Sequence, residues 1–474
     1  MIDSSIGPEN GRRWLVLAVV VAAQFMVVLD IAIVNVALPS IKSDLGFSEE
    51  SLQWVISAYA ILFGGFLLLG GRLADMFGRR RLFALGLALF AMSSLLCGIA
   101  WSEGSLIAFR ALQGLGGALL APAALSILMT TFAEGRERNL ALGIWGAASG
   151  SGGAAGVLLG GLLTSYLSWP WIFFINVPVG LAVIAATPWV LRESRSALRH
   201  RHFDFSGAAT GTAGLMLLVY ALTRAAENGW GTTASIALLA GSLLLILTFV
   251  AIELRSRAPL LPMRIFRMRT LAAANAASVV IAAVAFSEFF LLTLYMQQVL
   301  GYSAIQTGTA FVAITLTIVV FSNVAQTLVT RLGARSVLAS GLLLNAVALG
   351  ALSRAPFHGH YFWDLFPAFL LTGVAMALSF VSMTIAGLSG VRREDAGVAS
   401  GLINTSRQIG GAVGLAAVST VAAGANGFHV AFYVLTGLAV GGALIAALLI
   451  EPQPGGVTVQ LVVPEALEPV EEAA

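Results

Sequence analysis

The chain has 474 residues, of which 58% are hydrophobic and 10% are charged. Soluble domains carry about 25% charged residues, so this composition excludes an ordinary soluble protein. The net charge is +3, but the arginines are scattered over short segments rather than gathered on one face, which argues against nucleic acid as a partner. Uncharged apolar stretches of about 20 residues recur along the chain, and each is long enough to cross a bilayer as a helix.

These stretches predict an all-α integral membrane protein with fourteen spans. They are continuously apolar rather than alternating, which favours helices over a barrel. The predicted spans are residues 14–37, 52–71, 82–100, 104–130, 139–164, 171–191, 206–224, 232–252, 271–296, 307–330, 336–354, 361–388, 396–424 and 429–450.

The basic residues predict how the spans are oriented. Of the 26 lysines and arginines, 21 fall at the N-terminus or in loops that follow even-numbered spans. Cytoplasmic loops carry an excess of Lys and Arg. We therefore expect a multi-pass protein of a bacterial inner membrane, with both termini in the cytoplasm and an even number of spans.

The longest cytoplasmic loops divide the chain into blocks of six, two and six spans. We expect an N-terminal six-helix bundle at 1–195, an inserted helix pair at 196–262 and a C-terminal six-helix bundle at 263–451. The remaining residues, 452–474, contain proline, glycine and several acids. This composition predicts a disordered cytoplasmic tail.

Two charged residues lie inside apolar spans of the N-terminal block. Asp30 is 16 residues into the first span, about 24 Å along a helix, and Arg110 is about 9 Å into the fourth span, which runs the opposite way. The two residues should therefore lie at similar height. Gln113 shares a helix face with Arg110. The pattern predicts either a proton-linked site facing a central cavity or a structural ion pair.

The loop after the second span, GRLADMFGRRR at 71–81, combines glycines, an acid and arginines. Gly71 and Gly78 permit a tight turn or a close helix approach. Asp75 can pair with an arginine or cap a helix N-terminus. Arg79 and Arg80 complete the segment as candidate motif residues. The segment is either a gating motif or a plain cluster of cytoplasmic arginines.

The fifth span repeats small residues at helical spacing, among them Gly152, Gly156, Gly160 and Gly161. Such stripes let two helices approach closely, which favours both stable packing and sliding of one surface on another.

The C-terminal block carries two further charged residues within spans. Glu288 lies in the ninth span between aromatic residues and is a candidate for binding a proton or a cationic substrate, or for a structural hydrogen bond. Arg407 shares a face of the thirteenth span with Asn404 and Gln408, which implies a cavity or a carboxylate partner. Aromatic candidates for substrate contact are Tyr59, Phe289 and Tyr295.

The loop signature at 71–81 resembles that of the major facilitator superfamily. Four further segments narrow the resemblance to its fourteen-span drug:proton antiporter branch: LDIAIVNVALP at 29–39, RALQGLGG at 110–117, WPWIFFINVPVG at 169–180, and the thirteenth-span pattern around 397–414. The resemblance covers essentially the whole chain. It implies two six-helix bundles around a central cavity, plus two inserted helices.

The resemblance also implies a function: proton-coupled export of drugs or other small organic molecules, with multidrug or antibiotic resistance as the outcome. The proton-coupling residues would be Asp30, Arg110 and Glu288, and the protein would act as a monomer. One departure keeps a symporter or importer open as an alternative. The antiporter motif of the fifth span usually has a Gly-Pro pair, whereas Gly156 is followed by Val157.

Other classes of function lack their motifs. We find no phosphate-binding loop of the GxxxxGK[ST] type and no HExxH or similar metal spacing. Cys97 is the only cysteine, so a cysteine metal cluster is excluded. We therefore expect no cofactor, no metal and no enzymatic activity. A sensor or membrane enzyme would need a catalytic constellation that the sequence does not contain.

Overall fold

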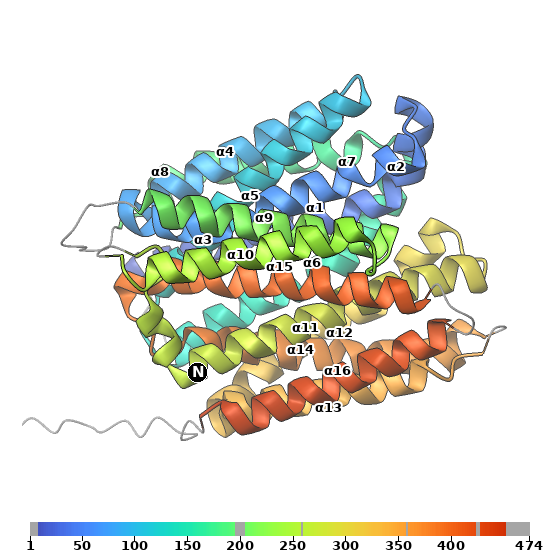
Figure 1. The fold of residues 1–474 in the computed structure, drawn as a ribbon. Coiled ribbons are helices and arrows are strands. Elements are labelled where there is room, and N and C mark those ends of the chain that lie inside the picture. Colours follow the sequence, from blue (N-terminus) through green and yellow to red (C-terminus); the bar gives the residue numbers. More distant parts are fainter. Residues whose placement is uncertain (1–7, 195–203, 257–258, 357–358, 423–426, 452–474) are drawn as a thin grey trace, which may run out of the picture.

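The computed structural model describes residues 8–194, 204–256, 259–356, 359–422 and 427–451 (Figure 1). Every regular element in these residues is a helix, as the apolar stretches predict. The predicted disordered tail at 452–474 lies outside the described residues, as does most of the loop after the sixth predicted span.

The first block of the chain forms six long helices and two short ones. They are α1 (Pro8–Leu45), α2 (Glu49–Leu52), α3 (Trp54–Phe77), α4 (Arg79–Gly98), α5 (Glu103–Thr131), α6 (Arg136–Tyr166), α7 (Trp171–Phe174) and α8 (Asn176–Val190). The middle block forms α9 (Phe205–Asn228) and α10 (Thr233–Glu253).

The last block again forms six long helices, joined by short helical turns. They are η1 (Met263–Arg267), α11 (Arg269–Leu294), η2 (Tyr295–Val299), α12 (Ala304–Leu332), α13 (Ala334–Leu352), η3 (Tyr361–Leu365), α14 (Phe366–Leu388), η4 (Arg393–Asp395), α15 (Ala396–Ala422) and α16 (Gly427–Leu449).

Local sequence explains where several of these helices begin and turn. Ser102 and Ser303 form capping boxes at the start of α5 and α12, which satisfy backbone N–H groups that have no partner within the helix. Gly78 joins α3 to α4 with φ of 114°, and Gly333 joins α12 to α13 with φ of 81°. Glycine adopts this backbone region without the steric cost that a Cβ would add.

The number of spans is a separate question from the number of helices. Fourteen helices of 15 residues or more occur in the described residues. Twelve segments are long and apolar enough to cross a membrane, and α6, which is bent by 41°, would make thirteen. The 27-residue α15 is not among them, because polar residues around Arg407 lower its hydropathy. The count of fourteen spans therefore stays a prediction.

The first and last blocks face each other along several pairs of helices. Helix α3 packs against α15, and α6 packs against α12 and α14. The middle pair, α9 and α10, pack on each other, and α9 also contacts α3 and α15 (Figure 1). The pair thus lies beside the line where the two larger blocks meet. Where the domains begin and end remains our proposal from the sequence.

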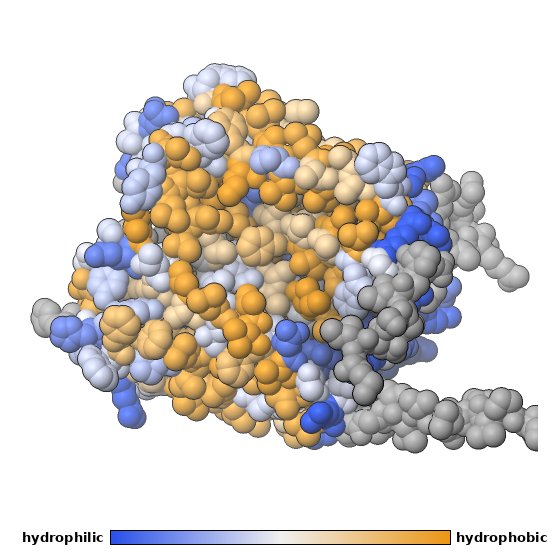
Figure 2. Space-filling model, turned by 180° about the vertical axis from the view of Figure 1, so that it is seen from behind, coloured by the Kyte–Doolittle hydropathy of each residue, from blue (hydrophilic) through white to orange (hydrophobic). Residues whose placement is uncertain are grey.

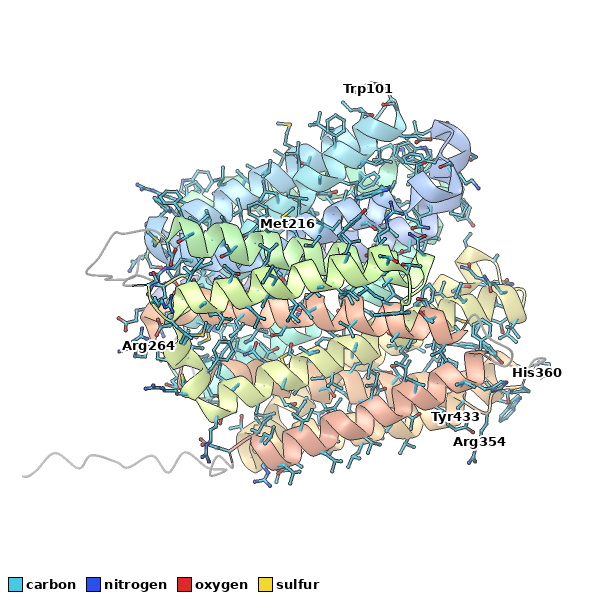
Figure 3. All side chains as sticks on the ribbon, in the orientation of Figure 1. Trp101, Met216, Arg264, Arg354, His360 and Tyr433 are labelled. Atoms are coloured by element: carbon cyan, nitrogen blue, oxygen red, sulfur yellow. The ribbon has the colours of Figure 1, made fainter. Side chains whose placement is uncertain are left out.

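Apolar side chains cover much of the face shown in Figure 2, and hydrophilic residues gather toward its two ends. Exposed apolar residues lie along α10, including Leu243, Leu244 and Leu247. Figure 3 shows Arg264 at one end of the molecule and Trp101, Arg354 and His360 at the other. We call the first the arginine-rich end, since it also holds Arg79 and Arg392. An apolar surface of this extent indicates contact with lipid.

The glycine stripe of α6 packs against α1. A Cβ on Gly152 would lie 2.8 Å from a Val28 side-chain carbon, and one on Gly160 would lie 2.9 Å from the Ile33 carbonyl oxygen. Gly161 is buried. The stripe therefore brings two helices of the same block together, which gives it a packing role within that block.

We expect Gly156→Ala to lower the melting temperature of the purified protein by several degrees. Its Cβ would lie 2.7 Å from the Ala32 Cβ and 2.8 Å from the Leu29 carbonyl oxygen, and overpacking of this kind costs about 1–3 kcal/mol. Gly153→Ala is the matched control, because a Cβ there meets no atom within 4 Å. Equal melting temperatures for the two variants would contradict close α1–α6 packing.

Candidate functional site

Asp30 and Arg110 form an ion pair in the interior of the first block. The Arg110 Nη1 lies 2.7 Å from Asp30 Oδ2, and the side chains are 1% and 0% exposed. Gln113 and Asn176 each donate a hydrogen bond of 2.8 Å to Asp30 Oδ1. The structure thus brings together residues from α1, α5 and α8, as the matching depths of the first two predict.

Hydrogen bonds from neighbouring groups compensate the buried charges of both Asp30 and Arg110. Arg110 also donates to the Val55 carbonyl at 3.0 Å and to Gln113 Oε1 at 2.6 Å. Its guanidinium lies 4.4 Å from the centre of the Tyr59 ring, a distance at which a cation and an aromatic face attract. A buried ion pair needs such additional bonds to offset the loss of water around both ions.

The residues of this network are not among those that line the cavity between the two large blocks, described below. Gln113 was expected to contact substrate, but it is 0% exposed and bonded to Asp30, Arg110 and Ser94. Tyr59 is 2% exposed and covers the Arg110 guanidinium. Gln113 is held inward by its hydrogen bonds to the charged pair, and Tyr59 by the contact of its ring with the Arg110 guanidinium.

Glu288 is buried inside the second large block. It is 0% exposed and accepts hydrogen bonds from the Thr372 hydroxyl on α14, at 2.7 Å, and from the Asn345 amide on α13, at 3.3 Å. Both hydrogen-bond partners of the carboxyl are neutral. It faces the interior of this block rather than the space between the two blocks.

A cavity of about 480 Å³ lies between the two large blocks. Its lining comes from α1, α3 and α6 on one side and from α11, α14 and α15 on the other. Four predicted contact residues line it: Phe289, Asn404, Arg407 and Gln408. Tyr295 is not among the lining residues, and its hydroxyl donates a hydrogen bond to the Pro356 carbonyl at 2.6 Å.

The two blocks are joined at the arginine-rich end by Asp75. Its carboxylate accepts hydrogen bonds of 3.2 Å from the backbone N–H groups of Gly397 and Val398, at the start of α15. Arg79 donates to the same carboxylate at 2.7 Å. A helix N-terminus favours a negative charge, so Asp75 forms a contact between blocks that we call the closure contact. A Cβ on Gly71 would overlap the Gly397 carbonyl oxygen.

Other residues of the loop signature bond within the first block. The Arg80 backbone N–H donates to Glu193 Oε1 at 3.2 Å, and the Arg81 side chain lies 3.7 Å from Glu193. Gly78 packs against the same carboxylate. On the other side of the closure contact, Asp395 pairs with Arg264 at 2.9 Å. Burial raises the pKa of Asp395, and the charge of Arg392 opposes that shift.

Sequence reasoning missed several partners of the buried acids. Asn176 and Ser94 complete the Asp30 network, and Asn345 and Thr372 hold Glu288. A usable signal was present, because polar residues within apolar spans tend to face the protein interior. No group of three metal-binding side chains occurs in the part of the chain that the structure describes.

Comparison with known proteins gives three findings. The model of the Major Facilitator Superfamily matches residues 20–415. The puromycin resistance protein pur8 of Streptomyces alboniger is 40% identical over 428 residues, which cover 90% of this chain and 84% of that protein. The cephamycin export protein CmcT of Amycolatopsis lactamdurans is 43% identical over 408 residues, which cover 85% and 84%.

A solved structure adds a comparison at the level of the fold. The crystal structure of the human organic anion transporter MFSD10 superposes with a TM-score of 0.67, covering 93% of this chain and all of that one, at 19% sequence identity. At this identity the similarity concerns the fold alone.

Proposed function

The chain belongs to the Major Facilitator Superfamily, and from that premise we propose that it exports small organic molecules across the bacterial cytoplasmic membrane in exchange for protons. The observation that carries the proposal is the cavity between two six-helix blocks that touch through the closure contact at one end. Rocking the blocks about this cavity would expose it to each side of the membrane in turn.

The relatives support export as the direction. One is a resistance protein for puromycin and another an export protein for cephamycin, and both match most of this chain. We propose that this protein likewise moves a drug-like organic molecule outward. A binding site of about 480 Å³ with an apolar wall suits a cargo of that size.

Proton coupling in this proposal involves the Asp30–Arg110 network and Glu288. All three ionisable groups are buried. Asp30 and Glu288 lie in helices that also contribute lining residues to the cavity. Arg110 lies in α5, which packs against two such helices, α1 and α3. Protonation would weaken the bonds that Asp30 makes to α5 and α8, and so favour one arrangement of the helices over another.

The remaining parts of the proposal concern topology and assembly. We propose fourteen spans with both termini in the cytoplasm, so that the arginine-rich end faces the cytoplasm in line with the distribution of basic residues. Under this orientation the cavity is closed toward the cytoplasm. We further propose that the protein works as a monomer and catalyses no chemical reaction on its cargo.

A second candidate is a proton-coupled importer on the same fold. Val157 favours it, because the antiporter motif usually places a helix-bending proline at this position, and Val157 lines the cavity. The two candidates differ in the direction in which a proton gradient drives the cargo.

Inside-out vesicles from a host that lacks other pumps test the direction. On energisation, vesicles with the protein should accumulate members of a panel of antibiotics and dyes, and a protonophore should abolish the accumulation. Vesicles from the same host without the gene are the control. Accumulation in right-side-out vesicles instead would establish the importer and reject the exporter.

A further inference from the structure

The cavity between the blocks has an unbalanced charge. Among the described residues that line it, Arg407 is the only one with a charged side chain. The others with polar side chains are Gln24, Asn35, Ser149, Thr293, Gln297, Asn404 and Gln408. No described residue forms an ion pair with Arg407, whose guanidinium lies 5.2 Å from the centre of the Phe380 ring. The wall therefore presents one positive charge and no negative one.

The nearby acids are directed elsewhere. Asp30 is bonded to Arg110, Gln113 and Asn176, and Glu288 to Thr372 and Asn345. Both carboxyls are 0% exposed and neither lines the cavity. The two acids thus supply no counter-charge at the cavity surface, although the sequence made Glu288 a candidate for binding a cationic substrate.

The rest of the wall is largely apolar and aromatic. Five phenylalanines line it: Phe63, Phe286, Phe289, Phe290 and Phe380. Aromatic walls bind flat apolar groups, while a few polar groups fix orientation and specificity. Gln408, the residue after Arg407, lines the same cavity and can donate hydrogen bonds through its amide.

We propose that the cavity selects amphipathic organic anions. A carboxylate or sulfonate of the cargo would pair with the Arg407 guanidinium, and its rings would lie against the phenylalanines. A guanidinium binds such groups strongly because charge and hydrogen bonds act together. A cationic cargo of the same shape would meet an unpaired like charge in a poorly solvated space. The inference rests on the proposed transport function and adds the chemical class of the cargo.

Three dansyl compounds test the charge preference on one ring system: dansylglycine is an anion, dansylamide is neutral and dansylcadaverine is a cation. Their fluorescence is titrated against the full-length protein in lipid nanodiscs, with empty nanodiscs as the background. We expect the wild type to bind dansylglycine at least about tenfold more tightly than dansylcadaverine, as charge complementarity predicts. Dansylamide should lie between the two.

Two substitutions assign the preference to Arg407, with a third as the conservative control. Arg407→Gln should bring the three affinities within about threefold of one another, whereas Arg407→Lys keeps the charge and should keep the order. Gln408→Glu adds a negative charge beside Arg407 and should weaken dansylglycine binding selectively. This variant retains Arg407, so it tests the inference even where Arg407→Gln does not fold.

The inference is overturned if the wild type binds none of the three compounds, or binds dansylcadaverine as tightly as dansylglycine. The inference is also overturned if neither Arg407→Gln nor Gln408→Glu changes the order of the three binding affinities. Transport separates this outcome from failure of the proposed function. Preferential anion binding without proton-driven accumulation of dansylglycine would reject the exporter and leave the charge selectivity standing. Proton-driven accumulation of dansylcadaverine in preference to dansylglycine would support the exporter and reject the selectivity for anions.

Discussion

Replacing Asp30 by asparagine is expected to abolish proton-driven efflux while cargo still exchanges down its own gradient. Asparagine has nearly the same shape as the protonated acid and does not titrate, so the variant permanently mimics the protonated form. One proton moving through about 150 mV supplies roughly 3.5 kcal/mol, which sustains a cargo gradient of a few hundred-fold. The accumulation ratio of the variant should therefore fall from that range to about one.

A purely structural ion pair predicts a different pattern. Removing one partner leaves the other charge buried without compensation, which costs about 3–5 kcal/mol. Folded yield would then fall in Asp30→Asn and in Arg110→Gln, and the double variant would recover both yield and efflux. We would measure folded yield, active efflux and downhill exchange for the two single variants and the double variant.

The matched control is Asp44→Asn, which makes the same change near the end of the same helix, where Asp44 accepts a hydrogen bond from Trp169 at 2.8 Å. It should retain active efflux because Asp44 lies outside the network. Full active efflux in Asp30→Asn would reject the proton role of this residue and transfer it to Glu288.

Asp75→Asn is expected to slow transport strongly without preventing insertion into the membrane. The carboxylate accepts two backbone N–H bonds across the blocks and the bond from Arg79. Hydrogen bonds to charged groups contribute about 1.5–3 kcal/mol each, so losing the charge should disfavour the closed arrangement by a factor on the order of ten or more. Turnover falls because each cycle must pass through that arrangement. Turnover is measured at equal folded protein.

Two further variants isolate the closure contact from the rest of the loop signature. Gly71→Ala leaves every charge in place but forces a Cβ against the Gly397 carbonyl oxygen, so it should reproduce the Asp75→Asn defect. Glu193 lies at the same end and accepts hydrogen bonds from the backbone N–H groups of Arg80 and Ser194, all within one block. Glu193→Gln removes its charge without affecting a contact between the blocks. It should retain most turnover. Wild-type turnover in both Asp75→Asn and Gly71→Ala would contradict a role of the closure contact in transport. The arginines of the loop signature would then serve only to orient the protein in the membrane.

The depth of a residue within its membrane span could be predicted from the sequence better than the neighbouring helix that its side chain meets. Helical rise and membrane thickness fix the depth of a residue in a span, which is why Asp30 and Arg110 could be expected to meet. Lateral neighbours are not fixed in this way. The bonds from Asn345 and Thr372 to Glu288 depend on how α11, α13 and α14 are placed around one another, and spacing along one helix carries no information on that.

The cavity residues show the same limit. Asn404, Arg407 and Gln408 stand out as a polar face on an apolar helix, so their place on the cavity wall could be predicted. Tyr59 and Tyr295 could not be assigned, because an aromatic residue in a span packs, covers a charge or contacts substrate depending on helix rotation. Gln113 was placed on the correct face, but that face meets Asp30 rather than the cavity.

The proposed transport cycle requires that the two blocks expose one cavity alternately at opposite ends. Spin labels at Trp189→Cys and Leu332→Cys report on the arginine-rich end, and labels at Trp101→Cys and Trp363→Cys on the other; the four side chains are 81%, 59%, 72% and 83% exposed. The native Cys97 is buried, so it should not take up label.

The measurement is the distance distribution of each label pair in nanodiscs, for the wild type and for Asp75→Asn. We predict that the variant lengthens the distance at the arginine-rich end and shortens the distance at the other end. Distances that lengthen together at both ends, or that remain those of the wild type at both, would contradict alternating access about this cavity.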